Sequence, residues 1–188
     1  MSQEYLQRDI VQTGSQTTAT WASWLKVHRK AATTNVIWIA AASGASENVI
    51  AFTANDHSKL LVYDYKNSAY RYRLTTDNTF IDFSNWFHLT IAWDTTQTRE
   101  DERLTIYLNG VRANPRSYIL DNTDARDHEL GISTRGEHQV FGRNNFGGNN
   151  YNGNVSYSDA YLVDGVALNA DAFGYIKKGK GNISQGSP

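Results

Sequence analysis

The stretch from Asn144 to Tyr151 carries the side chains best suited to binding chemistry in this sequence. It combines amides, two glycines and two aromatic rings. Aromatic rings stack on the apolar faces of sugars, while amides both donate and accept hydrogen bonds. The candidate carbohydrate-binding residues are Asn144, Asn145, Phe146, Asn149, Asn150 and Tyr151. Asparagine and glycine are also what a long hairpin turn requires, so the same composition fits a purely structural loop.

Residue patterns typical of catalysis are missing from the sequence. No serine lies in a G-x-S-x-G pattern, and no expected strand carries two carboxylates two or four residues apart, as a sugar hydrolase on a β-sandwich would need. The histidines show no paired spacing typical of zinc and are expected to lie on the surface or in strands. They are His28, His57, His88, His128 and His138. We therefore expect a protein that is not an enzyme, with a glycan hydrolase as the remaining enzymatic alternative.

Metal and phosphate motifs are approached but not completed. The absence of cysteine excludes disulfides, thiolate metal sites and a cysteine nucleophile. Residues 121–127 resemble a calcium loop but lack glycine at the sixth position and glutamate at the twelfth. Residues 174–181 fit a phosphate-binding loop until Gly181, where serine or threonine should bind magnesium. The sequence predicts no metal site and no cofactor. A bound calcium ion stays an open alternative, but no motif supports it.

Length and charge limit the partners. A chain of 188 residues suits one domain, and a net charge of -1 provides no field to attract nucleic acid or an anionic membrane. The first residues are polar, and no apolar run approaches the about 20 residues of a membrane span. We expect no nucleic-acid and no membrane partner.

The elements that must position these side chains are strands. Two alternating runs between Trp86 and Gly110 predict a central β-hairpin, joined by a charged, solvated loop over residues 94–103. Asn109 and Gly110 tolerate positive φ and predict a turn after the second run. The apolar files expected to face the core are Leu89, Ile91 and Trp93 in the first run and Leu104, Ile106 and Leu108 in the second.

Other alternating runs surround this hairpin, and no window sustains helical periodicity for three turns. In residues 19–27, Trp21 and Trp24 point to opposite faces, and we expect both rings to pack in the core. Residues 111–137 are polar and irregular, which predicts a long excursion across the surface. Residues 167–173 predict one short helical turn with Asn169 as its cap.

The chain divides by composition into three parts. Residues 1–18 form a polar N-terminal arm with a possible edge strand, residues 19–174 the β-sandwich domain, and residues 175–188 a basic, glycine-rich C-terminal tail.

In order along the chain, several stretches resemble the concanavalin A-like or laminin-G-like lectin domains found in structural proteins of marine tailed phages. They are residues 5–8, 20–30, 60–65, 86–111 and 151–174. The resemblance implies an all-β fold, a jelly-roll β-sandwich of two antiparallel sheets. In two respects the chain departs from the family. Relatives often continue past Gly174 into an acidic, tryptophan-containing segment, and no cluster here matches a calcium-lectin motif.

The resemblance also implies a role: a non-enzymatic structural protein at the virion surface, a capsid decoration or a tail-associated component. It would contact other virion proteins through the N-terminal arm and the C-terminal tail and form a homo-oligomer. The alternative is a carbohydrate-binding adhesin module that contacts host surface glycans through the tip from Asn144 to Tyr151.

Overall fold

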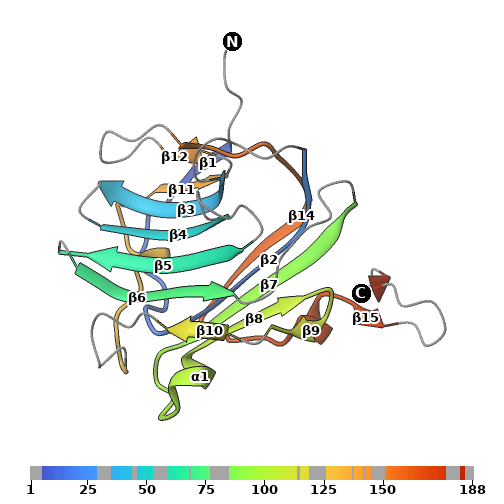
Figure 1. Ribbon diagram of the computed structural model, residues 1–188. Coiled ribbons are helices and arrows are strands. Elements are labelled where there is room, and N and C mark those ends of the chain that lie inside the picture. The colour runs from blue at the N-terminus through green and yellow to red at the C-terminus, as the bar shows by residue number, and fades with distance from the viewer. Residues whose placement is uncertain are drawn as a thin grey trace.

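Two antiparallel sheets face each other in the computed structural model (Figure 1). The structure describes residues 6–28, 35–43, 46–52, 59–67, 69–76, 85–113, 115–118, 126–136, 138–141, 143–144, 151–176 and 183–184. No helix in these ranges is long and apolar enough to cross a membrane. The fold is the all-β jelly-roll sandwich that the resemblance to lectin domains implies.

Sheet A is the larger sheet, with seven strands among the described residues. In spatial order these are β1 (Leu6–Asp9), β11 (His138–Phe141), β3 (Asn35–Ser43), β4 (Ser46–Phe52), β5 (Leu60–Lys66), β6 (Ala69–Thr76) and β10 (Pro115–Tyr118). The short β1 therefore lies at one edge of the sheet, where it pairs with β11 among the described strands.

Sheet B packs against sheet A and has five strands in the described part of the chain. They are β14 (Val155–Asp164), β2 (Thr18–Val27), β7 (Phe87–Asp94), β8 (Leu104–Leu108) and β9 (Val111–Arg112). Two small hairpins pair β12 (Arg143–Asn144) with β13 (Tyr151–Asn152) and β15 (Tyr175–Ile176) with β16 (Ile183–Ser184). The helical turns are α1 (Glu100–Arg103), η1 (Gly131–Ser133) and η3 (Ala170–Ala172).

The predicted central hairpin is confirmed as β7 and β8. Leu89 lies opposite Leu108, and Trp93 lies opposite Leu104. Both apolar files belong to the core between the sheets, where Trp21, Trp38 and Trp93 are fully buried. The connection is less irregular than expected because it contains α1, which Figure 1 shows at the end of the hairpin. Asn109 and Gly110 adopt φ values of 48° and 80°, as the predicted turn requires.

The expectation that both Trp21 and Trp24 pack in the core is wrong for Trp24. Its ring lies on the outer face of sheet B, half-buried, with its centroid 5.2 Å from that of His88. Thr90 and Ala92 share this outer face and are also buried. A second layer therefore covers part of the outer face, which alternation along one strand could not reveal.

Residues 165–174, called here the covering segment, form that layer. The Thr20 hydroxyl donates to the Val166 carbonyl at 2.7 Å and accepts from the Leu168 N–H at 2.8 Å. Further along, the Phe173 ring packs beside His88 and Tyr161, with centroids 6.3 Å and 5.7 Å away. The predicted helical turn in this segment is η3, a short 3-10 helix.

The surface excursion predicted for residues 111–137 is wrong in both of its described parts: residues 111–112 and 115–118 are the strands β9 and β10, and residues 126–136 pack into the sandwich. Leu130 and Ile132 are fully buried in the core, and η1 packs against β3 and β4. The Leu130 N–H donates to the Gln16 carbonyl at 2.6 Å, which ties this segment to the chain before β2. Two isolated apolar residues in a polar sequence gave no periodic signal, so only their tertiary partners identify them as core.

Candidate functional site

The predicted carbohydrate-binding tip is described only at its base. Asn144 pairs with Tyr151 across the β12–β13 hairpin, so the chain does reverse there. Asn145, Phe146, Asn149 and Asn150 lie outside the described residues, as do the side chains at both ends of the hairpin. A sugar site at this tip stays a prediction.

An open pocket of about 270 Å³ lies on the outer face of sheet B. Its floor comes from adjacent strands, with Ala92 on β7 opposite Thr105 on β8, and Tyr107 on β8 opposite Arg112 on β9. These side chains share one face because the residues that alternate with them, such as Trp93 and Ile106, point into the core. The small side chains of Ala92 and Thr105 leave the hollow that larger residues would fill.

The rim of this pocket comes from the end of β7, from the connection that follows it and from the covering segment. Asp94 ends β7, and Gln97 and Glu102 follow in the connection that contains α1. Ala167 and Asn169 belong to the covering segment and close the opposite side. The pocket therefore exists only because the covering segment crosses sheet B beside β7 and β8.

Asp94 is held as an oriented carboxylate at the pocket wall. Its Oδ1 accepts from the Thr96 hydroxyl at 2.6 Å and from the Thr96 N–H at 3.1 Å, and its Oδ2 accepts from Gln97 Nε2 at 2.6 Å. Burial alone would raise the pKa of Asp94, but the hydrogen bonds from Gln97 and Thr96 outweigh it and lower the pKa. The group is a fixed, ionised acceptor at neutral pH.

Tyr107 and Asn169 form the second fixed element. The Tyr107 hydroxyl donates to Asn169 Oδ1 at 2.8 Å, which holds the phenol ring against the covering segment. The bond uses the oxygen of Asn169 and leaves its Nδ2 to donate elsewhere. Asn169 occupies the N-cap position of η3, as predicted, but its side chain makes no cap bond there. Its side chain is directed to β8 instead.

Carbohydrate binding suits this combination of groups. An aromatic ring, an oriented carboxylate, an amide and a guanidinium offer a stacking surface together with acceptors and donors for hydroxyl groups. The volume of the pocket is slightly below the roughly 300–1,000 Å³ of sites that bind drug-sized ligands. It therefore fits a small ligand or one end of a longer one. Sequence reasoning missed this site because its members come from three strands, the connection after β7 and the covering segment, which only the fold brings together.

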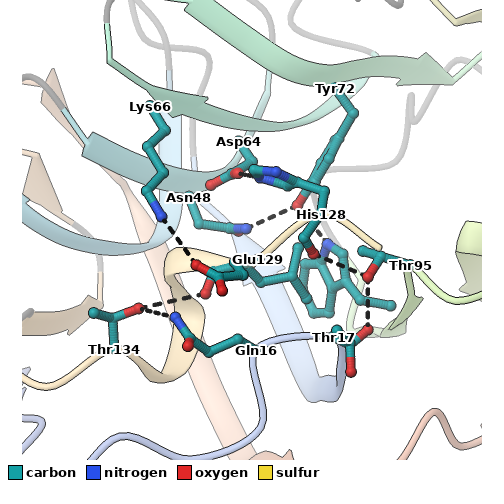
Figure 2. A network of polar contacts seen from close by, with 12 residues as sticks. Gln16, Thr17, Asn48, Asp64, Lys66, Tyr72, Thr95, His128, Glu129 and Thr134 are labelled. Carbon is teal, nitrogen blue, oxygen red and sulfur yellow. Dashed lines mark hydrogen bonds and ion pairs between the residues drawn. The ribbon is translucent and has the colours of Figure 1, made fainter. Parts of the chain in front are cut away.

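A separate polar network is buried between the sheets (Figure 2). The Tyr72 hydroxyl on β6 accepts from Trp93 Nε1 on β7 at 2.5 Å and from Asn48 Nδ2 on β4 at 2.8 Å. Burial, and then the charge of Asp64, raise the pKa of Tyr72 well above its ordinary value. The phenol is therefore protonated and links the two sheets.

His128 completes this network by binding Asp64 through its Nε2. The two side chains are only 10% and 2% exposed. Such a pair can orient an imidazole for acid–base chemistry, but no serine, threonine or cysteine of the described residues binds the His128 ring. Its carbonyl accepts from the Thr95 hydroxyl at 2.9 Å. The expectation of a surface or strand position is wrong for His128, which anchors residues 126–136 to the core.

The described residues also contain no group of three or more histidines and carboxylates that could hold a metal ion. The calcium-like stretch at residues 121–127 is described only at Arg126 and Asp127. The prediction that this stretch holds no metal therefore falls largely on residues outside the described ranges.

Comparisons with known proteins bear on the fold. No protein-family model and no curated protein matches the sequence. Among solved structures, the binding domain of botulinum neurotoxin serotype D matches with a TM-score of 0.58 and 14% identity over 98% of this chain and 44% of that one. Domain 4 of the arabinanase AbnA from Geobacillus stearothermophilus, in complex with arabinotriose, gives 0.54 and 15%, covering 82% and 64%.

A third match is the carbohydrate-binding module CBM40 of a Ruminococcus gnavus sialidase, bound to α2,3-sialyllactose. Its TM-score is 0.53 at 11% identity, over 89% of this chain and 95% of that one. This chain thus spans less than two thirds of the neurotoxin and arabinanase domains but nearly the whole sialidase module. At these identities the likeness shows the fold: this protein has the jelly-roll sandwich of lectin-like domains.

Proposed function

We propose that this protein is a non-enzymatic, lectin-like module that binds carbohydrate in the pocket over sheet B. The observation that carries this function is the convergence of Asp94, Tyr107 and Asn169 on one open hollow. Two domains of the same fold, the arabinanase domain and the sialidase module, are described with a bound sugar. The absence of a nucleophile bound to His128 among the described residues, and the burial of that histidine, favour binding over catalysis.

A glycan array tests this function directly. The Ala167→Leu variant should fill the pocket from the exposed covering segment without disturbing the core, and should abolish binding that the wild-type protein shows. Ala160→Leu is the matched control, because Ala160 is an exposed alanine on β14, away from the pocket lining. No bound glycan, or equal binding by both variants, would contradict a site in this pocket. Incubation of a bound glycan with the protein should leave it intact.

We also propose the tip from Asn144 to Tyr151 as an alternative glycan contact, separate from the pocket: it precedes Val155, which pairs with Val27, whereas Asp94 at the pocket pairs with Thr18 at the other end of β2. Phe146→Ala and Tyr151→Ala should weaken binding if this tip contributes, whereas Tyr107→Ala tests the pocket alone. If the tip variants abolish binding and Ala167→Leu does not, the site lies at the tip.

We further propose that the module is displayed on a phage virion, as a capsid decoration or tail-associated protein, where the glycan would be one on the host surface. The edge strand β1 favours docking to a neighbour, because all its residues are exposed and Leu6 is 70% exposed. An exposed strand at the edge of a sheet can pair with a strand of another chain. Particles assembled with a variant lacking residues 175–188, or with Leu6→Lys, should incorporate less of it; unchanged incorporation by both would contradict docking through the arms.

A further inference from the structure

The pocket over sheet B carries an excess of negative charge, and this bears on which glycans it accepts. Asp94 and Glu102 contribute two carboxylates to its wall, against the single guanidinium of Arg112. The lining side chains thus carry a formal charge of -1, and the nearby Arg103, whose Nε donates to the Gln97 carbonyl at 2.7 Å, offsets it in part. Since a pocket focuses the field of its lining groups, this charge acts at short range on whatever enters.

Asp94 keeps its negative charge near neutral pH, because it does not take up a proton there. Gln97 and Thr96 donate to both of its oxygens, and its pKa lies below the ordinary value. An ionised carboxylate has about four acceptor positions, and three are occupied by these bonds. One acceptor position is left for a donor from the ligand.

Arg112 offsets the carboxylates only in part because its guanidinium is already engaged. Its Nη2 donates to the Asp101 carbonyl in α1. The hydrogen bond from Arg99 is the main cause that lowers the pKa of Asp101, and the nearby charge of Arg112 adds to it, so part of the positive charge of Arg112 acts on a group outside the pocket. Arg99, a cation near the rim, pairs with Asp101 at 2.8 Å and with Glu102 at 3.6 Å.

We propose that the pocket selects glycans bearing hydroxyl or amino groups and rejects glycans bearing acidic groups. The selection rests on the proposed carbohydrate-binding function. A hydroxyl or ammonium group donates to the remaining position on Asp94, whereas a sugar carboxylate meets two like charges and a guanidinium that is partly occupied. The sialidase module of the same fold is described with α2,3-sialyllactose, a sugar that carries a carboxylate, so the proposed selection differs from that complex.

Three trisaccharides of similar size test this selection: glucosamine trimer, maltotriose and trigalacturonate. At low salt, wild-type protein should bind the glucosamine trimer at least about tenfold more tightly than trigalacturonate, with maltotriose between them. Asp94→Asn keeps the shape of the side chain and removes its charge, so the ratio should fall to within about threefold. Added salt should narrow the ratio in the wild-type protein because exposed charges are screened.

Asp9→Asn is the control, since it makes the same charge change on β1 of sheet A. It should retain the wild-type ratio, and all variants should keep the wild-type melting temperature within a few degrees. Trigalacturonate bound as tightly as the glucosamine trimer, and lost in Ala167→Leu, would overturn the charge selection while leaving the sugar site in place. Binding of none of the three probes and of no array glycan would overturn the proposed function itself.

Discussion

Tyr72 is the residue on which the buried polar network converges. Its hydroxyl satisfies donors from both sheets, Trp93 Nε1 and Asn48 Nδ2. Tyr72→Phe leaves both donors buried without an acceptor, which should lower the free energy of unfolding by about 1–3 kcal/mol. Denaturant unfolding measures this cost. Tyr161→Phe, at a half-exposed ring, is the control and should change stability by less than about 0.5 kcal/mol; equal effects would contradict the bridging role.

His88 makes the stability of the protein depend on pH. Burial under the covering segment lowers its pKa, and the charge of Asp159 opposes that shift only in part. The folded state therefore binds fewer protons than the unfolded state, in which histidine titrates near 6.5. Stability is fully present above that value and is lost as pH falls through it toward the lower pKa of the folded state.

We expect the free energy of unfolding to decrease between about pH 7 and pH 5, and less steeply in His88→Asn. Unfolding curves at several pH values measure the slope. His28→Asn is the matched control, because His28 is an exposed residue that follows β2. A wild-type slope in His88→Asn would show that another group carries the pH dependence.

At the scale of elements, the His128–Asp64 pair fastens residues 126–136 into the sandwich. Residues 64 apart in sequence meet there, with little exposure on either side. His128→Ala leaves a buried carboxyl group without its partner and should cost at least about 1–3 kcal/mol of unfolding free energy. Unfolding in urea is the measurement.

The double variant Asp64→Asn with His128→Ala separates the pair from simple loss of packing. An amide costs less to bury than a carboxylate, so the double variant should be more stable than His128→Ala alone. If it is instead less stable, the pair is not what holds this segment.

At the scale of the whole molecule, the sandwich is held by its core and its sheet pairing. Three fully buried tryptophans lie between the sheets, and the chain contains no cysteine to form a disulfide. We expect a chelator such as EDTA to leave the melting temperature unchanged, because no described residues are grouped to hold a metal. A fall in melting temperature that calcium reverses would place an ion outside the described ranges, with residues 121–125 as the first region to test.

Local patterns in the sequence determined the strands and the central hairpin. Alternation of Leu89, Ile91 and Trp93 identified the buried file of β7, and Asn109 with Gly110 identified the turn after β8. Such features depend on neighbours two residues away and on the φ values a residue tolerates, so a single sequence contains them. The resemblance to lectin-like domains added the pairing of the strands into a jelly-roll sandwich.

Only the tertiary structure decided where the pocket lies and which polar groups are buried. Tyr107 and Asn169 are 62 residues apart, and the burial of His88, Thr90 and Leu130 depends on segments remote in sequence. Alternation shows which residues share a face but not what covers that face. One part of the outer face of sheet B is buried and another forms the open pocket, because the covering segment crosses this face at one place. That crossing is a long-range contact that no local pattern encodes.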